Sequence, residues 1–374
     1  MARLFQPLQL GTLKLSNRII IAPMCQYSAT EQGQISYWHE QQWGTYALSG
    51  AGLCIVEATA VQPEGRISYA DLGLWNDEQG ERIAVLLKKI KTVSPMPFAI
   101  QLAHAGRKAS TEKPWNVSHG KAQIASADAH GWQTVAPAEL AFQESDEKPH
   151  ALTVVELKTI QQDFAQAAKR AVEVGFDLIE LHAAHGYLMH QFMSPLANTR
   201  TDEYGGSFEN RIRMVMETFE SIKKAVPENF PVGIRLSAQD WVEGGWTLEE
   251  TVALSKQLEQ AGAVYIHVSS GGLHPQQKID VHASYQVPFA AQVKENVSIP
   301  VIAVGLVTES MQAEGILEYE QADAVGLARA MLYDPRWPWH AAAELGETIQ
   351  IAPQYLRCQP HGFRDLFHPF DENS

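Results

Sequence analysis

Three side chains that can donate protons, His182, His185 and Tyr187, stand close together in the stretch LIELHAAHGYLMHQF, residues 178–192. Two histidines in a His-x-x-His pattern can bind zinc when further ligands converge on them. The same pair can instead donate hydrogen bonds to an oxygen atom that gains negative charge during a reaction. The apolar run FDLIELH ends at the first histidine, which predicts a buried strand that opens into a loop there. Which chemistry applies depends on the residues that other elements bring to the same place.

Short apolar runs of this kind recur along the chain and alternate with helical stretches. In the stretch 156–174, Leu157, Ile160 and Phe164 share one stripe of a predicted helix, and TLEE at the start of Thr247–Gln260 is a capping box. Near-continuous apolar strands indicate a parallel sheet that is covered on both faces, and eight of them with intervening helices predict a (β/α)8 TIM barrel. The predicted strands are Arg18–Pro23, Leu53–Thr59, Pro97–Leu102, Phe176–His182, Val232–Ser237, Val264–Ser269, Pro300–Val304 and Ala322–Leu327.

A doubly wound sheet is the main alternative for alternating strands and helices. That fold usually carries a glycine-rich dinucleotide fingerprint after its first strand, whereas the first strand here ends in APMCQYS. No low-complexity linker divides the chain, so we expect a single domain over residues 1–374. Within it we expect an N-terminal hairpin in residues 1–17, a long excursion over the barrel mouth after the third strand in 104–151, and a C-terminal tail in 346–374.

Composition narrows the class of protein. The formal net charge of -14, from 29 basic and 43 acidic residues, argues against nucleic acid or an anionic membrane as the main partner. The three cysteines, Cys25, Cys54 and Cys358, are widely spaced, which supports neither a disulfide framework nor an iron–sulfur cluster. The first residues lack the apolar core of a signal peptide, and no run approaches transmembrane length. We therefore expect a cytoplasmic protein.

The ends of the predicted strands hold the candidate functional residues, because the loops that follow converge on one face of such a barrel. A metal-dependent hydrolase is disfavoured, because the first strand end has no histidine and the ends of the fifth, seventh and eighth have no metal-type ligand. No lysine stands at a strand end for Schiff-base chemistry. Glycine and arginine after the last two strands suit a phosphate group. The residues in question are Met24, Cys25, Tyr27, Ala58, Gln101, His182, His185, Tyr187, Arg235, Gly271, Gly272, Gly305 and Arg329.

Four motifs together resemble the old yellow enzyme family of FMN-dependent ene-reductases: APMCQYSA, IQLAHAGRKA, GIRLS and the long block ELHAAHGYLMHQFMSPLANTRTDEYGGSFENR. More narrowly, Cys25 and the His-x-x-His pair resemble the thermophilic-like and xenobiotic-reductase branch. The resemblance covers essentially the whole chain, and the block that ends in TDEYGGSFENR is its most specific part. It implies a TIM barrel, in agreement with the strand count.

The resemblance implies non-covalent FMN as the cofactor and NADPH as the reductant. It places Arg235 near N1 of the flavin, where a cation would stabilise the reduced form. Where the family often has Gly-Arg at the phosphate site, this chain has Ala328 and Arg329. The positions that match the flavin ring are Pro23, Met24, Cys25, Ala58 and Gln101, and those that match the phosphate site are Gly305, Ala328 and Arg329.

The resemblance also implies reduction of a carbon–carbon double bond in enones, enals or nitro compounds. His182 and His185 would hold the substrate carbonyl oxygen while the β-carbon takes hydride from flavin N5. Tyr187 matches the proton donor to the α-carbon, and Tyr27 matches a further donor to the substrate. Cys25 would lie against the flavin and tune its potential without acting as a nucleophile. The physiological substrate is not indicated by the sequence.

The C-terminal QYLR resembles a segment that crosses to a neighbouring subunit and places an arginine, here Arg357, in that subunit's active site. We therefore expect a homodimer or homotetramer. Two other functions stay open from the residues: a catalytically silent flavin-binding sensor module, and a non-flavin metal-dependent hydrolase on the same barrel.

Overall fold

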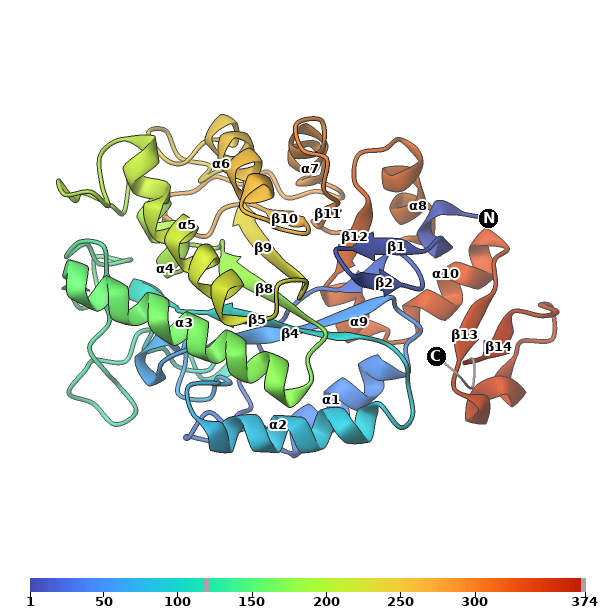
Figure 1. The fold of residues 1–374 in the computed structure, drawn as a ribbon. Helices are drawn as coiled ribbons and strands as arrows, with labels where there is room; N and C mark the ends of the chain where they lie inside the picture. Colours follow the sequence, from blue (N-terminus) through green and yellow to red (C-terminus); the bar gives the residue numbers. More distant parts are fainter. Residues whose placement is uncertain (118–121, 371–374) are drawn as a thin grey trace.

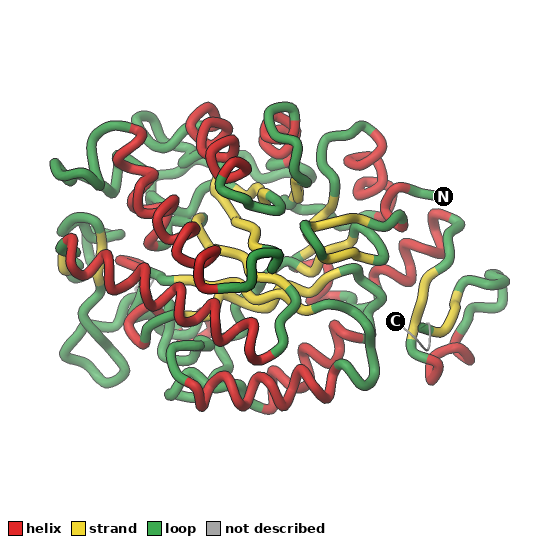
Figure 2. The backbone as a smooth tube through the Cα atoms, in the orientation of Figure 1, coloured by secondary structure: helices red, strands yellow, loops and turns green. Residues whose placement is uncertain are grey.

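Eight parallel strands close into a barrel in the computed structural model, which describes residues 1–117 and 122–370. Helices surround the strands, which lie at the centre of the molecule (Figures 1 and 2). The predicted (β/α)8 barrel is confirmed, and each strand lies within its predicted segment or one residue beyond it. In order around the barrel the strands are β3 (Ile19–Ile21), β4 (Leu53–Ala60), β5 (Phe98–Ala103), β8 (Leu178–Ala183), β9 (Val232–Ser237), β10 (Ile266–Ser269), β11 (Val301–Ala303) and β12 (Ala324–Leu327).

Side chains cap the beginning of several helices of the outer ring. Thr153 precedes the longest one and accepts a hydrogen bond from the backbone N–H of Glu156, whose carboxylate in turn accepts from the N–H of Thr153. Thr247 and Glu250 form the same box at the predicted start of another helix. The helices are α1 (Tyr37–Ala47), α2 (Asp77–Ile90), α3 (Val154–Val174), α4 (Leu188–Met193), α5 (Phe208–Ala225), α6 (Leu248–Gln260), α7 (Val287–Lys294), α8 (Ser310–Glu318), α9 (Arg329–Tyr333) and α10 (Trp337–Leu345). None of the helices within the described ranges is long and apolar enough to cross a membrane.

A hairpin of β1 (Leu8–Leu10) and β2 (Leu13–Leu15) closes the end of the barrel at which the strands begin. Its leucines form one buried cluster with residues from the first half of several strands, including Leu53 and Leu178. Burial of these side chains removes apolar surface from water at that end. The hairpin therefore covers this end of the barrel, whereas a cavity of about 190 Å³ lies at the opposite end, where the strands terminate.

The segment between β5 and α3 lies at this open end (Figure 1). It contains η3 (Gly106–Lys108), η4 (Pro114–Asn116) and a short parallel pair, β6 (Val135–Ala136) with β7 (His150–Ala151). Arg107 ties it to the strand ends by donating to the backbone carbonyl of Leu273 at 3.0 Å. Four residues of this excursion, 118–121, lie outside the described part of the chain.

The C-terminal tail lies beside the N-terminus, away from the open end of its own barrel (Figure 1). Its strands β13 (Ile349–Ile351) and β14 (Phe367–Pro369) pair in parallel, and η5 (Pro353–Cys358) lies between them in the sequence. Trp339 anchors the tail through ring contacts with Tyr355 and Phe367. Residues 371–374 of the predicted tail fall outside the described ranges.

Candidate active site

The structure brings His182, His185 and Tyr187 together at the end of β8. The ring centroids of His182 and His185 lie 5.1 Å apart, those of His182 and Tyr187 lie 5.0 Å apart, and both pairs meet edge to face. The backbone makes this possible by turning sharply, with φ of 59° at His185 and 73° at Gly186. A Cβ on Gly186 would stand 2.1 Å from the carbonyl oxygen of Gly272, so only glycine fits there.

Hydrogen bonds fix which ring nitrogen of His182 carries the proton. The Nδ1 atom of His182 accepts from the backbone N–H of Ala184 at 3.2 Å, which leaves the proton on Nε2. In His185 it is Nε2 that is engaged, 2.7 Å from the hydroxyl oxygen of Ser269. The Ser269 hydroxyl can donate to Nε2 or accept from it, and it also lies 3.4 Å from Oε1 of Gln286; the proton of His185 is on Nδ1 when the hydroxyl donates to Nε2. Each ring thus keeps one nitrogen that no described protein group occupies.

Both histidines are neutral at physiological pH. Burial, and then the positive charge of Arg235, hold the pKa of His182 and of His185 well below the usual value of 6.5. A neutral imidazole can donate one hydrogen bond without bringing a full charge into the site. The pair can therefore polarise a bound oxygen as two neutral donors.

The loop after β3 contributes Cys25 and Tyr27 to the same site, and Tyr27 adopts a positive φ of 49°. A β-bulge in β4 turns Glu57 towards this loop, where its carboxylate accepts from the backbone N–H of Gln26 and lies 2.7 Å from Nε2 of His39. Glu57 thereby anchors the loop after β3 to strand β4. Pro23 and Met24 are half-buried at the start of the loop, and Ala58 follows the bulge within β4.

The thiol and both phenols of the site keep their protons. Burial raises the pKa of Cys25 well above its usual value, and the nearby carboxylates of Asp71 and Glu57 raise it further. Burial is also the main cause of the raised pKa values of Tyr27 and Tyr187. Cys25 is therefore a thiol. Because its phenol is protonated, Tyr187 can act as a proton donor.

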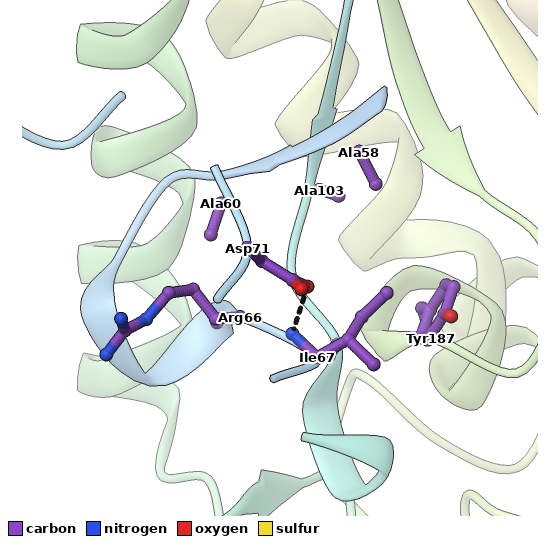
Figure 3. Close-up of a pocket in the computed structure, with 9 residues that line it drawn as sticks. Ala58, Ala60, Arg66, Ile67, Asp71, Ala103 and Tyr187 are labelled. Atoms are coloured by element: carbon purple, nitrogen blue, oxygen red, sulfur yellow. Dashed lines mark hydrogen bonds between the residues drawn. The ribbon is translucent and has the colours of Figure 1, made fainter. Parts of the chain in front are cut away.

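A small cavity next to Tyr187 contains the buried carboxyl group of Asp71 (Figure 3). Its oxygens accept from the backbone N–H of Ile67 at 2.8 Å and from the hydroxyl of Ser68 at 2.7 Å. Burial raises the pKa of Asp71 to about 7, despite the hydrogen bond from Ser68. Arg66 and Ile67 line the same cavity, together with small side chains of β4 and β5.

Lys108 is a site residue that the sequence did not reveal. Its ammonium group donates to the backbone carbonyls of His185 and Gly272, each at 2.8 Å, and lies 5.0 Å from the centre of the Tyr187 ring. Burial, and then Arg107, lower the pKa of Lys108 to about 7. Lys108 reaches the site from the turn η3, in the motif IQLAHAGRKA.

A second part of the site is a cavity of about 190 Å³ at the ends of β9 to β12. Arg235 and Arg329 both line it, and Nε of Arg235 is buried without a hydrogen-bond partner among the described residues. Gly305, whose φ is 122°, and Ala328 line the same cavity. Two guanidinium groups, one with an orphaned donor, fit an anionic ligand such as a phosphate or a reduced flavin.

Gln101 lies buried on β5, and its side-chain nitrogen donates to Glu180 at 2.7 Å. One N–H of the Gln101 amide is therefore used by Glu180 and is not available to the flavin that Gln101 is predicted to contact. Arg357 is not brought to the site of its own chain; it is exposed in η5 within the tail.

The histidine pair has no third ligating group that would make it a metal centre. In the described ranges no three His, Cys, Asp or Glu side chains are grouped to hold an ion. The nearby His190 is instead paired with Asp240 at 2.8 Å and accepts from the N–H of Gly186, which supports the turn. Arg211 binds Glu250 at 2.5 Å and so ties α5 to α6.

Comparison with known proteins shows similarity to one family of oxidoreductases. A family model described as NADH:flavin oxidoreductase / NADH oxidase family matches residues 3–347. The NADPH dehydrogenase of Geobacillus sp. (strain WCH70) is 41% identical over 355 residues, which are 95% of this chain and 98% of that protein. The NADPH dehydrogenase of Bacillus velezensis is 42% identical, over 95% of this chain and 99% of that protein.

Solved structures agree with these relatives. Morphinone reductase has a TM-score of 0.75 at 27% identity, with 99% of this chain and 94% of that chain covered. The old yellow enzyme homologue from Zymomonas mobilis has a TM-score of 0.74 at 26% identity, with 92% and 94% covered.

A closed barrel whose strand ends carry a histidine pair beside an arginine-lined cavity defines the protein as a TIM-barrel flavin oxidoreductase. The chain belongs to the NADH:flavin oxidoreductase / NADH oxidase family, which is the old yellow enzyme family. The resemblance found in the sequence is thereby confirmed, and the non-flavin hydrolase is set aside. The protein is a flavin-dependent oxidoreductase that uses FMN as cofactor and NAD(P)H as reductant.

Proposed function

We propose that the protein is an ene-reductase that reduces the carbon–carbon double bond of α,β-unsaturated carbonyl and nitro compounds. The observation that supports this most is the grouping of two neutral imidazoles, each with a free ring nitrogen, beside a protonated Tyr187. Bound FMN, once reduced by NAD(P)H, supplies the hydride for such a reaction. The chain itself must hold the substrate oxygen and provide the proton.

His182 and His185 are the proposed clamp on the substrate oxygen. Nε2 of His182 and Nδ1 of His185 would donate to the carbonyl or nitro oxygen and strengthen these bonds as negative charge develops on it. A donor of this kind contributes about 2.7–4 kcal/mol to transition-state stabilisation. The hydrogen bonds with Ala184 and Ser269 keep the two rings oriented, so little reorganisation is needed when the substrate binds.

Tyr187 is the proposed proton donor to the α-carbon, and Tyr27 a further donor to the substrate. Burial keeps the proton on both phenols. Lys108 supports this arrangement by holding the carbonyl of His185, two residues before Tyr187. Trp115 of the excursion contacts the Tyr27 ring at 6.1 Å, which extends the pocket wall towards solvent.

The remaining residues are proposed to hold FMN without a covalent bond. Pro23, Met24, Cys25, Ala58 and Gln101 would contact the ring system. Arg235 would lie near the part that gains negative charge on reduction, and Gly305, Ala328 and Arg329 would bind the phosphate. The arginine-lined cavity and the orphaned Nε of Arg235 support this assignment.

We further propose a homodimer or homotetramer in which Arg357 binds substrate or nicotinamide in a neighbouring subunit. Its exposure in a tail anchored by Trp339, away from its own barrel mouth, supports a role in another subunit.

Anaerobic reoxidation tests the proposed function. The holoenzyme is reduced with one equivalent of NADPH and mixed with 2-cyclohexenone or a nitroalkene, while the flavin absorbance is followed and the product is analysed by mass. Return of the oxidised flavin band, with a product two mass units heavier, is expected. Failure to reoxidise with every enone, enal and nitroalkene tried would overturn the proposal and favour the flavin-binding sensor without turnover.

A further inference from the structure

Glu180 holds a carboxylate inside the barrel, two residues before His182 on β8, where the proposed mechanism does not use it. The side chain is fully buried. It accepts from Nε2 of Gln101 at 2.7 Å, from the hydroxyl of Tyr265 at 2.9 Å and from Nδ1 of His267 at 2.8 Å. A buried carboxylate is costly unless it is hydrogen-bonded and paired, and three donors from β5 and the β10 segment meet that need.

The carboxylate dictates how the Gln101 amide is oriented. An ionised carboxylate can only accept hydrogen bonds, so the nitrogen of the Gln101 amide must face Glu180. The amide oxygen of Gln101 is then the acceptor left for a ligand. The pyrimidine edge of a flavin carries one N–H donor between two carbonyl oxygens, and this donor needs an acceptor. The reversed amide would place its nitrogen against that N–H.

The same carboxylate sits within the electrostatic reach of Arg235 on β9, the cation of the cofactor cavity. Burial opposes ionisation of Glu180, but His267, Arg235 and the Tyr265 hydroxyl together lower the pKa of Glu180 below its usual value. Burial and Arg235 lower the pKa of His267, so its ring is a neutral donor. Glu180 is therefore an anion within electrostatic reach of Arg235 and in direct contact with Gln101, two residues that we propose contact the flavin.

We propose that Glu180 is a positioning residue of the flavin site, which fixes the Gln101 amide with its oxygen available to the flavin and offsets part of the Arg235 charge. This inference rests on the proposed placement of FMN against Gln101 and Arg235. Reduced flavin carries more negative charge than oxidised flavin. A fixed carboxylate nearby disfavours the reduced form and so keeps the midpoint potential of the bound flavin low.

The variant Glu180→Gln keeps the size of the side chain and removes its charge. We expect the ratio of reduced to oxidised flavin affinity to rise at least tenfold, which is a midpoint potential about 30 mV more positive for a two-electron couple. We also expect weaker FMN binding, because the new amide can donate and no longer enforces one orientation of Gln101. Both quantities are measured on holoenzyme, by equilibration with a reference dye and by flavin fluorescence on dilution, without any alkene substrate.

Tyr265→Phe is the matched control, because it removes one hydrogen bond to Glu180 and keeps the carboxylate. Its midpoint potential should match that of the wild type. An unchanged potential in Glu180→Gln, or equal shifts in both variants, would overturn the inference. If Glu180→Gln does not fold, Glu180→Asp is the second variant: it keeps the charge and withdraws it from Gln101, so FMN should bind more weakly at an unchanged potential. Wild-type affinity for FMN in Glu180→Asp would contradict the positioning role, whereas a wild type without FMN would refute the proposed function itself.

Discussion

The imidazole of His182 and the phenol of Tyr187 meet edge to face, with ring centroids 5.0 Å apart and planes at 85°. The proposed donor to a carbonyl oxygen and the proposed proton donor therefore lie side by side. The turn with positive φ at His185 and Gly186 lies between them in the sequence. Separate roles for the two side chains can be tested one at a time.

Tyr187→Phe should slow the reduction of enones by about 10²–10⁴, the range for losing a general acid. Quinones accept electrons without a proton at carbon, so their reduction should fall much less. Stopped-flow reoxidation of the reduced enzyme by each acceptor measures this. A parallel loss with both acceptors would show that Tyr187 has another role.

Lys108→Met keeps the aliphatic stem and removes the ammonium group that holds the carbonyls of His185 and Gly272. A hydrogen bond from a lysine amine that is only partly protonated at neutral pH contributes about 0.5–1.5 kcal/mol, so loss of both should lower the free energy of unfolding by about 1–3 kcal/mol. Enone reduction should slow as well, because the His185 turn loses its support. Denaturant unfolding and kcat for an enone check both effects, with exposed Lys88→Met as the control. Unchanged unfolding would mean that these hydrogen bonds do not form in solution.

The pKa of Asp71 is raised from 3.8 to about 7 in the folded protein, so this group stabilises the fold at low pH and the contribution is lost as pH rises towards 7. Between low pH and pH 7 the contribution of Asp71 to the free energy of unfolding falls by about 4 kcal/mol at most. In Asp71→Asn this loss is absent. The stability of the variant relative to the wild type should therefore increase between pH 4 and pH 7 and stay level above that. Thermal unfolding of both proteins over this pH range measures the change. A difference in stability between variant and wild type that does not depend on pH would contradict a buried Asp71 that keeps its proton.

Arg357→Ala should lower the affinity for substrate or nicotinamide and leave the fold intact, since the side chain is exposed in its own chain. Chains with Arg357→Ala are mixed with chains carrying His182→Ala. If the arginine crosses, each mixed dimer has one intact site, so activity should exceed the average of the two variants. A fully active monomer in sedimentation, or no gain after verified mixing, would contradict the crossing.

The barrel could be predicted because its strands are buried on both faces and therefore apolar along their length, as in LCIVEAT and VGIRLS. The histidine pair and Tyr187 could be found because they follow one strand within a short motif. The partners of these residues could not. Lys108 meets His185 across 77 positions of sequence, and Glu180 meets Gln101 across 79, so their pairing depends on strand register around the barrel.

The role of Glu57 was hidden for a different reason. Regular alternation along β4 would not distinguish it from its buried neighbours, and only the bulge between Val56 and Ala58 turns it towards the loop that carries Cys25 and Tyr27. A bulge of this kind has no sequence signature. Short-range motifs therefore located the candidate reacting side chains, whereas the residues that contact and orient them emerged only from the three-dimensional structure.

The central claim is that His182 and His185 act on the substrate oxygen and not on a metal or on flavin binding. The most direct measurement is to determine both half-reactions separately for His182→Ala and His185→Ala, with bound FMN quantified in each. We predict FMN retention, a loss of about 10²–10³ in the reoxidation of reduced enzyme by 2-cyclohexenone, and a much smaller loss in flavin reduction by NADPH. Equal losses in both half-reactions, or activity restored by added zinc, would contradict the account.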